Sequence, residues 1–165
     1  CPVLLLRPDL PVSLRPVQAP RRLLLPLDGA PSSAATLTPA LALADELQAA
    51  VDILNVAERA EAPREPGTLT APLYIDQPQH EWPAWADEFA SRFATAFGQF
   101  PAASNRRVFV RSGDPASEIV RFAREEGSDL IVLQRNGGPQ AERAQVLKRV
   151  LADMPCPVLL LPGEH

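Results

Sequence analysis

The sequence predicts a single α/β domain, built as a three-layer sandwich around a five-stranded parallel sheet. Short apolar runs alternate along the chain with segments of helical character, which is the pattern of repeated βαβ units. These runs also lack polar alternation, as do strands that are buried on both faces of a parallel sheet. With 165 residues, the chain has room for one well-buried domain rather than two of ordinary size.

The first twenty residues lie outside this alternating pattern. Residues 1–6, CPVLLL, repeat the letters of residues 156–161, and we expect both segments to be strands. Residues 7–20, RPDLPVSLRPVQAP, carry a proline every few positions, so they suit neither a helix nor a central strand. We predict that they form an extended linker and that the domain proper covers residues 21–165.

The first half of the domain contains two predicted strands, at residues 23–27 and 51–56. The segment between them is rich in Ala and Leu and predicts a helix, with Pro31 in its first turn and Pro39 kinking it early. Residues 57–79 are polar and interrupted by prolines, which favours a long loop.

An amphipathic helix is predicted over residues 80–100, because large apolar residues recur there at three- and four-residue spacing. The aromatic face of this helix comprises Trp82, Trp85, Phe89, Phe93 and Phe97. Such a face usually belongs to a core or an interface rather than to a ligand site.

The second half of the domain continues the alternation. Its predicted strands are residues 106–111, 129–134 and 156–161, and its last helix is residues 141–154. The helix after the first of these strands carries its own boundary signals. Asp114 can cap it, Pro115 suits its first position, and Gly127 can end it.

Composition argues against several classes of function. The formal net charge is −4 and the Lys and Arg residues are scattered, so we expect no nucleic-acid partner. No apolar run reaches the ~18 to 20 residues that span a bilayer, so we expect no membrane contact and a cytoplasmic protein. The two histidines give no metal-ligand spacing and no catalytic pattern, so we expect neither a metal nor an enzyme. The two cysteines should be small apolar residues, each at the start of a buried strand.

Several stretches resemble the universal stress protein family. RRLLLPLDGA at residues 21–30 is similar to its first strand and aspartate turn, and GDPASEIVRFAREEGSDLIVLQ at 113–134 to its third helix and fourth strand. VLKRVLADMPCPVLLLP at 146–162 resembles its closing helix and final strand. The resemblance implies the Rossmann-like fold of the adenine nucleotide alpha hydrolases and covers roughly residues 21–56 and 106–162.

The repeated CPVLLL gains a meaning from this resemblance. Domains of the family often occur in tandem and pair antiparallel through their final strands, so residues 1–6 resemble the last strand of a preceding domain. We therefore expect an extra strand, antiparallel at the sheet edge, that covers the otherwise exposed final strand. The partner would be a second copy of the chain or the preceding domain. The expected interface comprises Val3, Leu4, Leu5, Leu6, Val158, Leu159, Leu160 and Leu161.

The resemblance also implies an adenine-nucleotide pocket. Asp28, after Pro26 in the strand, matches the aspartate that hydrogen-bonds the base, and Val56 matches a valine whose backbone meets it. A strand-end aspartate can equally well satisfy turn amides or cap the next helix. The family's glycine-rich phosphate loop is reduced here to Gly137 and Gly138, followed by Pro139, which has no N–H to donate.

We therefore expect a regulatory or structural domain that acts through pairing, with a degenerate phosphate loop and no cofactor. The alternative is a sensor that binds ATP or AMP through Asp28 and Val56 despite the shortened loop.

Overall fold

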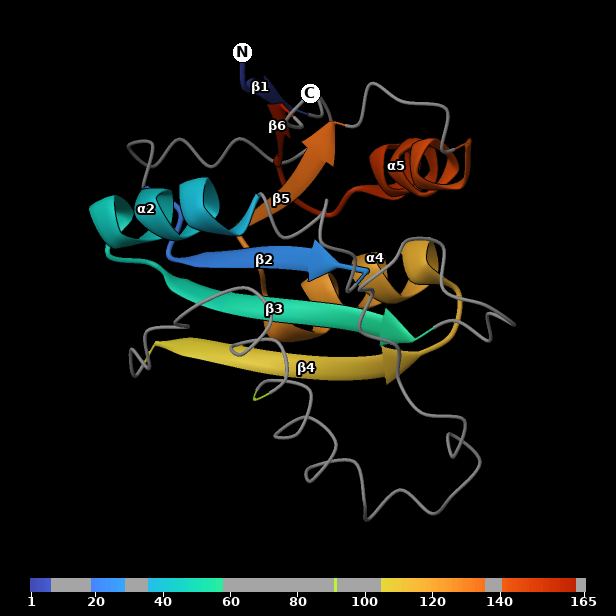
Figure 1. The fold of residues 1–165 in the computed structure, drawn as a ribbon, viewed down its shortest axis with the longest axis horizontal. Helices are drawn as coiled ribbons and strands as arrows, with labels where there is room; N and C mark the ends of the chain where they lie inside the picture. Colours follow the sequence, from blue (N-terminus) through green and yellow to red (C-terminus); the bar gives the residue numbers. More distant parts are fainter. Residues whose placement is uncertain (7–18, 29–35, 58–90, 92–104, 136–140, 163–165) are drawn as a thin grey trace.

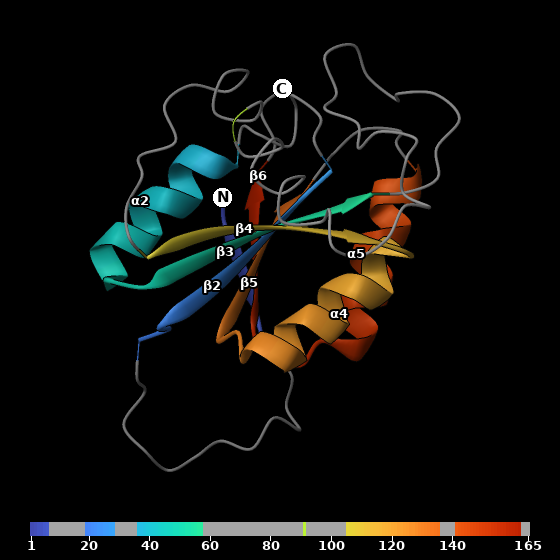
Figure 2. The same cartoon turned by 90° about the horizontal axis from the view of Figure 1, so that it is seen from below.

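A six-stranded sheet lies between two helical layers in the computed structural model, which describes residues 1–6, 19–28, 36–57, 91, 105–135 and 141–162. Figure 2 shows helix α2 on one face of the sheet and helices α4 and α5 on the other. The strands are β1 (Val3–Leu5), β2 (Arg22–Leu27), β3 (Ala50–Ala57), β4 (Arg106–Ser112), β5 (Leu130–Arg135) and β6 (Val158–Pro162). The helices are α2 (Leu37–Leu47), α4 (Pro115–Glu126) and α5 (Ala141–Asp153). The predicted three-layer α/β sandwich is confirmed.

The strand order is β1-β6-β5-β2-β3-β4. The pairs β2–β3, β3–β4, β2–β5 and β5–β6 are all parallel, so β2 to β6 form the five-stranded parallel sheet that the sequence predicts. Strand β1 pairs antiparallel with β6, as expected for the extra edge strand. The aromatic helix expected at residues 80–100 lies outside the described residues apart from Ser91, as does most of the predicted linker.

The core has two halves, one on each face of the sheet, because side chains of a strand alternate between faces. Leu23, Leu25 and Leu27 of β2 pack with the Ala and Leu side chains of α2. Leu24 faces the opposite way, into a cluster that includes Phe122 of α4 and residues of α5. Both clusters are almost free of solvent, which fixes the sheet firmly between its helices.

Helix α4 begins and ends where the sequence predicts. The Asp114 side chain accepts a hydrogen bond from the Ser117 backbone N–H, Pro115 stands at the start, and Gly127 ends the helix with a left-handed φ of 66°. In α2, Pro39 is the third helical residue and precedes the first intrahelical bond, in which Ala40 N–H donates to Thr36 O. The proline therefore removes no helical hydrogen bond.

A buried carboxylate joins the amino-terminal parts of three strands on the α4 face. The side chain of Asp52 in β3 is completely buried and accepts two hydrogen bonds from Arg107 of β4, at 2.8 and 3.0 Å. Arg22 of β2 lies 3.6 Å from the same carboxylate. Glu126 at the end of α4 accepts hydrogen bonds from both arginines, at 3.2 and 3.0 Å. Two acidic and two basic side chains thus tie β2, β3, β4 and α4 together.

Candidate functional site

The carboxyl ends of β2 and β5 mark the topological switch point of the sheet. From β2 the chain continues to β3 and β4 on one side, whereas β5 and β6 lie on the other side. Ligands of open α/β sheets bind outside the carboxyl ends of the strands at such a point. The residues that end these two strands, Asp28 after β2 and Arg135 in β5, are therefore the first candidates for a site.

The two central strands separate before they reach this edge. Strand β2 pairs with β5 only at Leu23 and Leu24, whereas it pairs with β3 along its whole length. Figure 1 shows β5 running away from β2 toward its arrowhead. Pro26, which has no N–H to donate, falls in the part of β2 that no longer pairs with β5. The carboxyl end of β2 is thus paired with β3 but not with β5.

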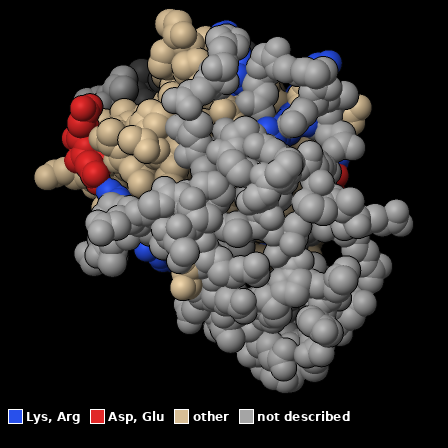
Figure 3. All heavy atoms as spheres, in the orientation of Figure 1, with Lys and Arg blue, Asp and Glu red and all other residues tan. Residues whose placement is uncertain are grey.

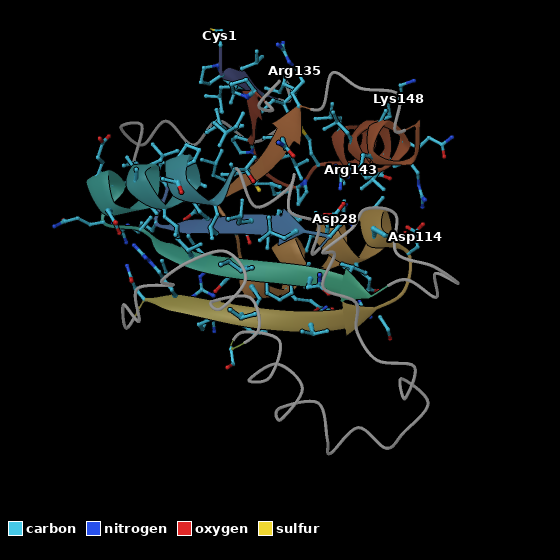
Figure 4. The ribbon with its side chains drawn as sticks, viewed as in Figure 1. Cys1, Asp28, Asp114, Arg135, Arg143 and Lys148 are labelled. Carbon is cyan, nitrogen blue, oxygen red and sulfur yellow. The ribbon has the colours of Figure 1, made fainter. Side chains whose placement is uncertain are left out.

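Asp28 is held by an ion pair with Arg143 of helix α5. The Arg143 Nε–H donates to the Asp28 Oδ2 at 2.7 Å. The Asp28 side chain is one-third exposed and that of Arg143 is 15% exposed, so the pair is partly shielded from water. Figure 4 shows Arg143 reaching from α5 toward Asp28 at the end of β2. The carboxylate that the family resemblance matches to a nucleobase-binding aspartate accepts a hydrogen bond from a cationic side chain of the same chain.

Val56 and Asn55 lie at the neighbouring end of β3. Val56 is partly buried, and Asn55, which is 3% exposed, is the Cα partner of Leu27 in the parallel ladder. The Asn55 Nδ2–H donates to the Leu27 carbonyl oxygen at 3.1 Å, which holds the end of β2 immediately before Asp28. The structure therefore brings Asp28 and Val56 to adjacent strand ends. Asn55 is a positioning residue that the sequence analysis missed, although a polar residue inside an apolar strand was a usable signal.

The two loop glycines of the predicted phosphate site, Gly137 and Gly138, lie outside the described residues. At the start of α4, Arg149 of α5 forms a two-pronged ion pair with Asp114. This pair lowers the pKa of Asp114 to about 2, chiefly through the Arg149 hydrogen bond and then through the hydrogen bond from the Ser117 N–H. Two arginines of α5 are thus paired with carboxylates that follow β2 and β4.

The second candidate site is the edge formed by β1 and β6. Val3 pairs with Leu160, Leu4 with Leu159, and Leu5 with Val158. Leu6 lies outside β1 and is 66% exposed, and Leu4 is 55% exposed. Leu161 continues β6 beyond the segment that β1 covers.

The cysteines only partly follow the expectation. Cys156 is buried just before β6, and burial raises the pKa of its thiol to about 12, so it is not a reactive thiolate. Cys1 is exposed, so the expectation that it starts a buried strand was wrong: the residue precedes a short edge strand in which Val3 and Leu4 are themselves exposed. Both cysteines are free.

The described residues contain no metal cluster, and the face drawn in Figure 3 shows no basic patch. No group of three or more His, Cys, Asp and Glu side chains could hold a metal in this part of the chain. On the face that Figure 3 shows, the described Lys and Arg atoms lie in separate places, and Asp and Glu atoms gather at its left margin. No described helix is long and apolar enough to cross a membrane.

Comparison with known proteins shows which family and which solved structures the chain resembles. The sequence model of the universal stress protein family matches residues 20–162. A universal stress protein solved in complex with cAMP is 23% identical, with a TM-score of 0.57 over 87% of this chain and 98% of that one. A protein of the same family from Burkholderia pseudomallei is 24% identical, with a TM-score of 0.54 over 89% and 99% of the two chains. A protein of unknown function from Pseudomonas aeruginosa PAO1 is 16% identical, with a TM-score of 0.61. The match spans 99% of this chain but only 52% of the Pseudomonas aeruginosa protein.

Proposed function

Because the chain belongs to the universal stress protein family, we propose that it is a regulatory or structural domain that pairs with a second domain through the β6 edge. In this proposal the domain needs no nucleotide cofactor and catalyses no reaction. The partner is a preceding domain of the same family, of which β1 is the last strand, or a second copy of the chain.

The observation that carries the proposal is the register of β1 on β6. The two paired segments have the same sequence, Val-Leu-Leu, and the central leucine of one, Leu4, lies opposite the central leucine of the other, Leu159. Two identical strands paired antiparallel in this way are related by a local two-fold axis. A two-fold axis is also what relates the two halves of a symmetric protein dimer. The β6 edge therefore accepts a strand of its own sequence in the geometry that pairing of two domains requires.

The length relation to the Pseudomonas aeruginosa protein supports the preceding-domain form of the proposal. Almost all of this chain, 99%, matches about half of that protein, whereas the shorter relatives match 87% and 89% of it. A two-domain chain in which the first domain ends with a strand like β1 would give this relation.

Pairing can be tested with the chain as it is by releasing β1. Leu5 packs against the core cluster on the α4 face, so Leu5→Asp should detach the strand and expose the β6 edge. The expected result is self-association, with the mass in sedimentation equilibrium rising from 17.9 kDa toward twice that value as concentration increases.

The matched control is Leu6→Asp, which adds the same charge one residue beyond β1 and should leave the mass of the chain unchanged. Hydrogen exchange of the Leu5→Asp dimer should show residues 158–161 protected. A Leu5→Asp chain that remains monomeric at all concentrations, with its β6 amides exchanging freely, would contradict the proposal.

The alternative function is an adenine-nucleotide sensor. One observation favours it, namely that Asp28 and Val56 lie at adjacent strand ends at the switch point. One similar structure is of a universal stress protein with cAMP. Calorimetric titration of the full chain with ATP and with AMP tests it. Saturable binding that Asp28→Ala abolishes would favour the sensor, and absence of heat with either nucleotide would favour the pairing domain.

A further inference from the structure

We propose that the outer edge of strand β1, the edge that faces away from β6, is a docking surface for a parallel strand and the helix that follows it, both supplied by a preceding domain. The proposal rests on the pairing through β6 proposed above. It adds a second surface of the chain, together with the secondary structure and the strand direction of the partner that fits it.

The segment around β1 carries all the exposed large apolar side chains of the described residues. Val3 is 36% exposed, Leu4 55% and Leu6 66%. Within the same part of the chain β1 pairs only with β6, and Figure 1 shows it at the margin of the sheet, beyond β6. An edge strand that has one unpaired side and apolar side chains is a template for a further strand.

The local two-fold axis between β1 and β6 indicates which neighbour this edge takes. Leu4 lies opposite Leu159, the central residue of the same three letters, so the axis relates residues 3–6 to residues 158–161. The outer edge of β1 is therefore equivalent to the edge of β6 that β5 occupies. Strand β5 pairs with that edge in parallel, over residues 131–135.

Equivalent residues of the two strands differ strongly in burial. Val158 is 0% exposed where Val3 is 36% exposed, and Leu161 is 7% exposed where Leu6 is 66% exposed. Val158 belongs to the core cluster on the α4 face and Leu161 to the cluster on the α2 face. The same residue types are thus buried in β6, where β5 is a second neighbour, and exposed at β1, where β6 is the only neighbour among the described strands.

The partner that would bury β1 to the same extent is a strand followed by a helix. Its strand is aliphatic and parallel to β1, as Ile131, Val132 and Leu133 of β5 are beside β6. Its helix packs apolar side chains on the α4 face, as Val150 of α5 does in the cluster that contains Val158. A domain that ends with β1 brings such a unit immediately before this strand, because β5, α5 and β6 follow one another in this chain.

A second copy of the chain fits this edge less well. Two copies that join their β1 edges, with like layers on the same side of the sheet, are related by a two-fold axis and pair antiparallel. The equivalent edge of β6 takes a parallel strand instead. Pairing of β1 with β1 would also extend over only three residues of each chain. The edge therefore fits a preceding domain better than a second copy.

The repeated sequence allows a test without any residue foreign to the chain. Residues 20–155 are joined directly to the full chain of residues 1–165, so that the middle CPVLLL completes a first domain and opens a second. Hydrogen exchange then reports the protection of the middle Val3–Leu5 and of the final β6. Urea denaturation compares Leu6→Ala in the middle of this tandem chain with two matched variants of the single chain, Leu6→Ala and Leu161→Ala.

The middle Val3–Leu5 amides should exchange at least about a hundredfold more slowly than in the single chain, because a strand with two neighbours opens only together with its sheet. The final β6 should be protected as well. Leu6→Ala should shift the urea midpoint little in the single chain, where Leu6 is 66% exposed. In the tandem chain it should shift the midpoint at least about threefold more, as Leu161→Ala should in the single chain.

Three results would overturn the proposal. A protected final β6, beside a middle strand that exchanges as fast as in the single chain, would overturn it alone and leave pairing through β6 intact. A protected middle strand, beside a final β6 that exchanges freely, would overturn the proposed function with it. A single chain that dimerises in sedimentation, and that Leu6→Asp returns to a monomer, would assign the edge to a second copy.

Discussion

Single charged side chains inside this domain are held by partners that are remote in sequence. Asp52 and Arg107 are 55 residues apart, and Asp28 and Arg143 are 115 residues apart. The first pair lies toward the amino ends of the strands and belongs to a group of four charges, whereas the second lies at the carboxyl ends. Ion pairs between elements far apart in sequence therefore stand at both ends of the sheet.

The first residue-scale prediction concerns the completely buried carboxylate of Asp52. Arg107→Met should destabilise the chain by about 3 kcal/mol, because it leaves a buried charge with only Arg22 at 3.6 Å. Arg121→Met, which removes an exposed arginine from an ion pair on α4, should cost less than about 1 kcal/mol. Urea denaturation measures both free energies of unfolding. Equal costs would mean that Asp52 does not depend on Arg107.

The second residue-scale prediction concerns pH. Arg149 and the Ser117 N–H lower the pKa of Asp114 from 3.8 to about 2, so the pair stabilises the fold above pH 4 and is lost as the pH falls through about 2. Asp114→Asn keeps the helix cap but removes the charge. The wild type should exceed this variant in stability by at most about 1 kcal/mol at neutral pH, since the pair is largely exposed. Urea midpoints of both chains should approach each other as the pH falls from 4 through about 2, and a difference at pH 2 as large as that at neutral pH would exclude the ion pair as its source.

At the scale of elements, the sequence predicts the start and end of a helix where the capping position carries a residue type that favours capping. Asp114 and Gly127 bound α4 as expected, because an acceptor side chain and a residue free of Cβ strain are visible in the sequence. Helix α2 ends instead at Gln48, whose φ of 53° is left-handed, and no sequence signal marks that position. The short connection into β3 imposes this conformation. The Ala49 N–H donates to the Ala44 carbonyl oxygen, and β3 begins at the next residue, Ala50.

The element-scale prediction is that substitutions at these two helix ends change the stability of the chain in opposite directions. Gln48→Gly should stabilise the chain by about 0.5 to 1 kcal/mol, because glycine adopts a left-handed φ without strain. Gly127→Ala should destabilise it by about 1 kcal/mol, and backbone strain alone accounts for this cost because a Cβ there meets no atom within 4 Å. Thermal or urea denaturation measures both. Changes of the same sign would mean that backbone strain does not govern these two positions.

At the scale of the whole molecule, the sequence predicts the layers and the parallel sheet because apolar periodicity reports directly on burial. Leu23 to Leu25 and Val51 to Leu54 are apolar runs, interrupted only by Asp52, and they form central strands. The antiparallel β1 was also predicted, from the repeated CPVLLL and the family resemblance. Asp52 interrupts the apolar run for a reason that its sequence neighbours do not reveal, since its partners Arg22 and Arg107 come from β2 and β4. Both arginines also donate to Glu126 of α4.

The candidate site was predictable only in part for the same physical reason. Asp28 and Val56 end strands, and strand ends can be placed from the sequence, so their neighbourhood at the switch point followed from the fold class. The Arg143 side chain comes from a helix that returns over the sheet, and its direction depends on how α5 packs against α4. Sequence spacing gives the existence of that helix but not the rotation that brings Arg143 rather than a neighbour to Asp28.

The last prediction concerns the stability of the edge strand β1 relative to the central strands β2 and β3. Strand β1 pairs over three residues on one side only, and Leu4 is 55% exposed, whereas β2 is central and its leucines are fully buried. Local opening of a short exposed edge costs much less than global unfolding. In hydrogen exchange of the wild-type chain, the amides of Val3–Leu5 should therefore exchange far faster than those of β2 and β3. Detachment of β1 from β6 would then be a low-energy motion available in the native state, which pairing through β6 requires. Exchange of β1 as slow as that of β2 would show that the edge is permanently closed and that a partner cannot gain access by displacing β1.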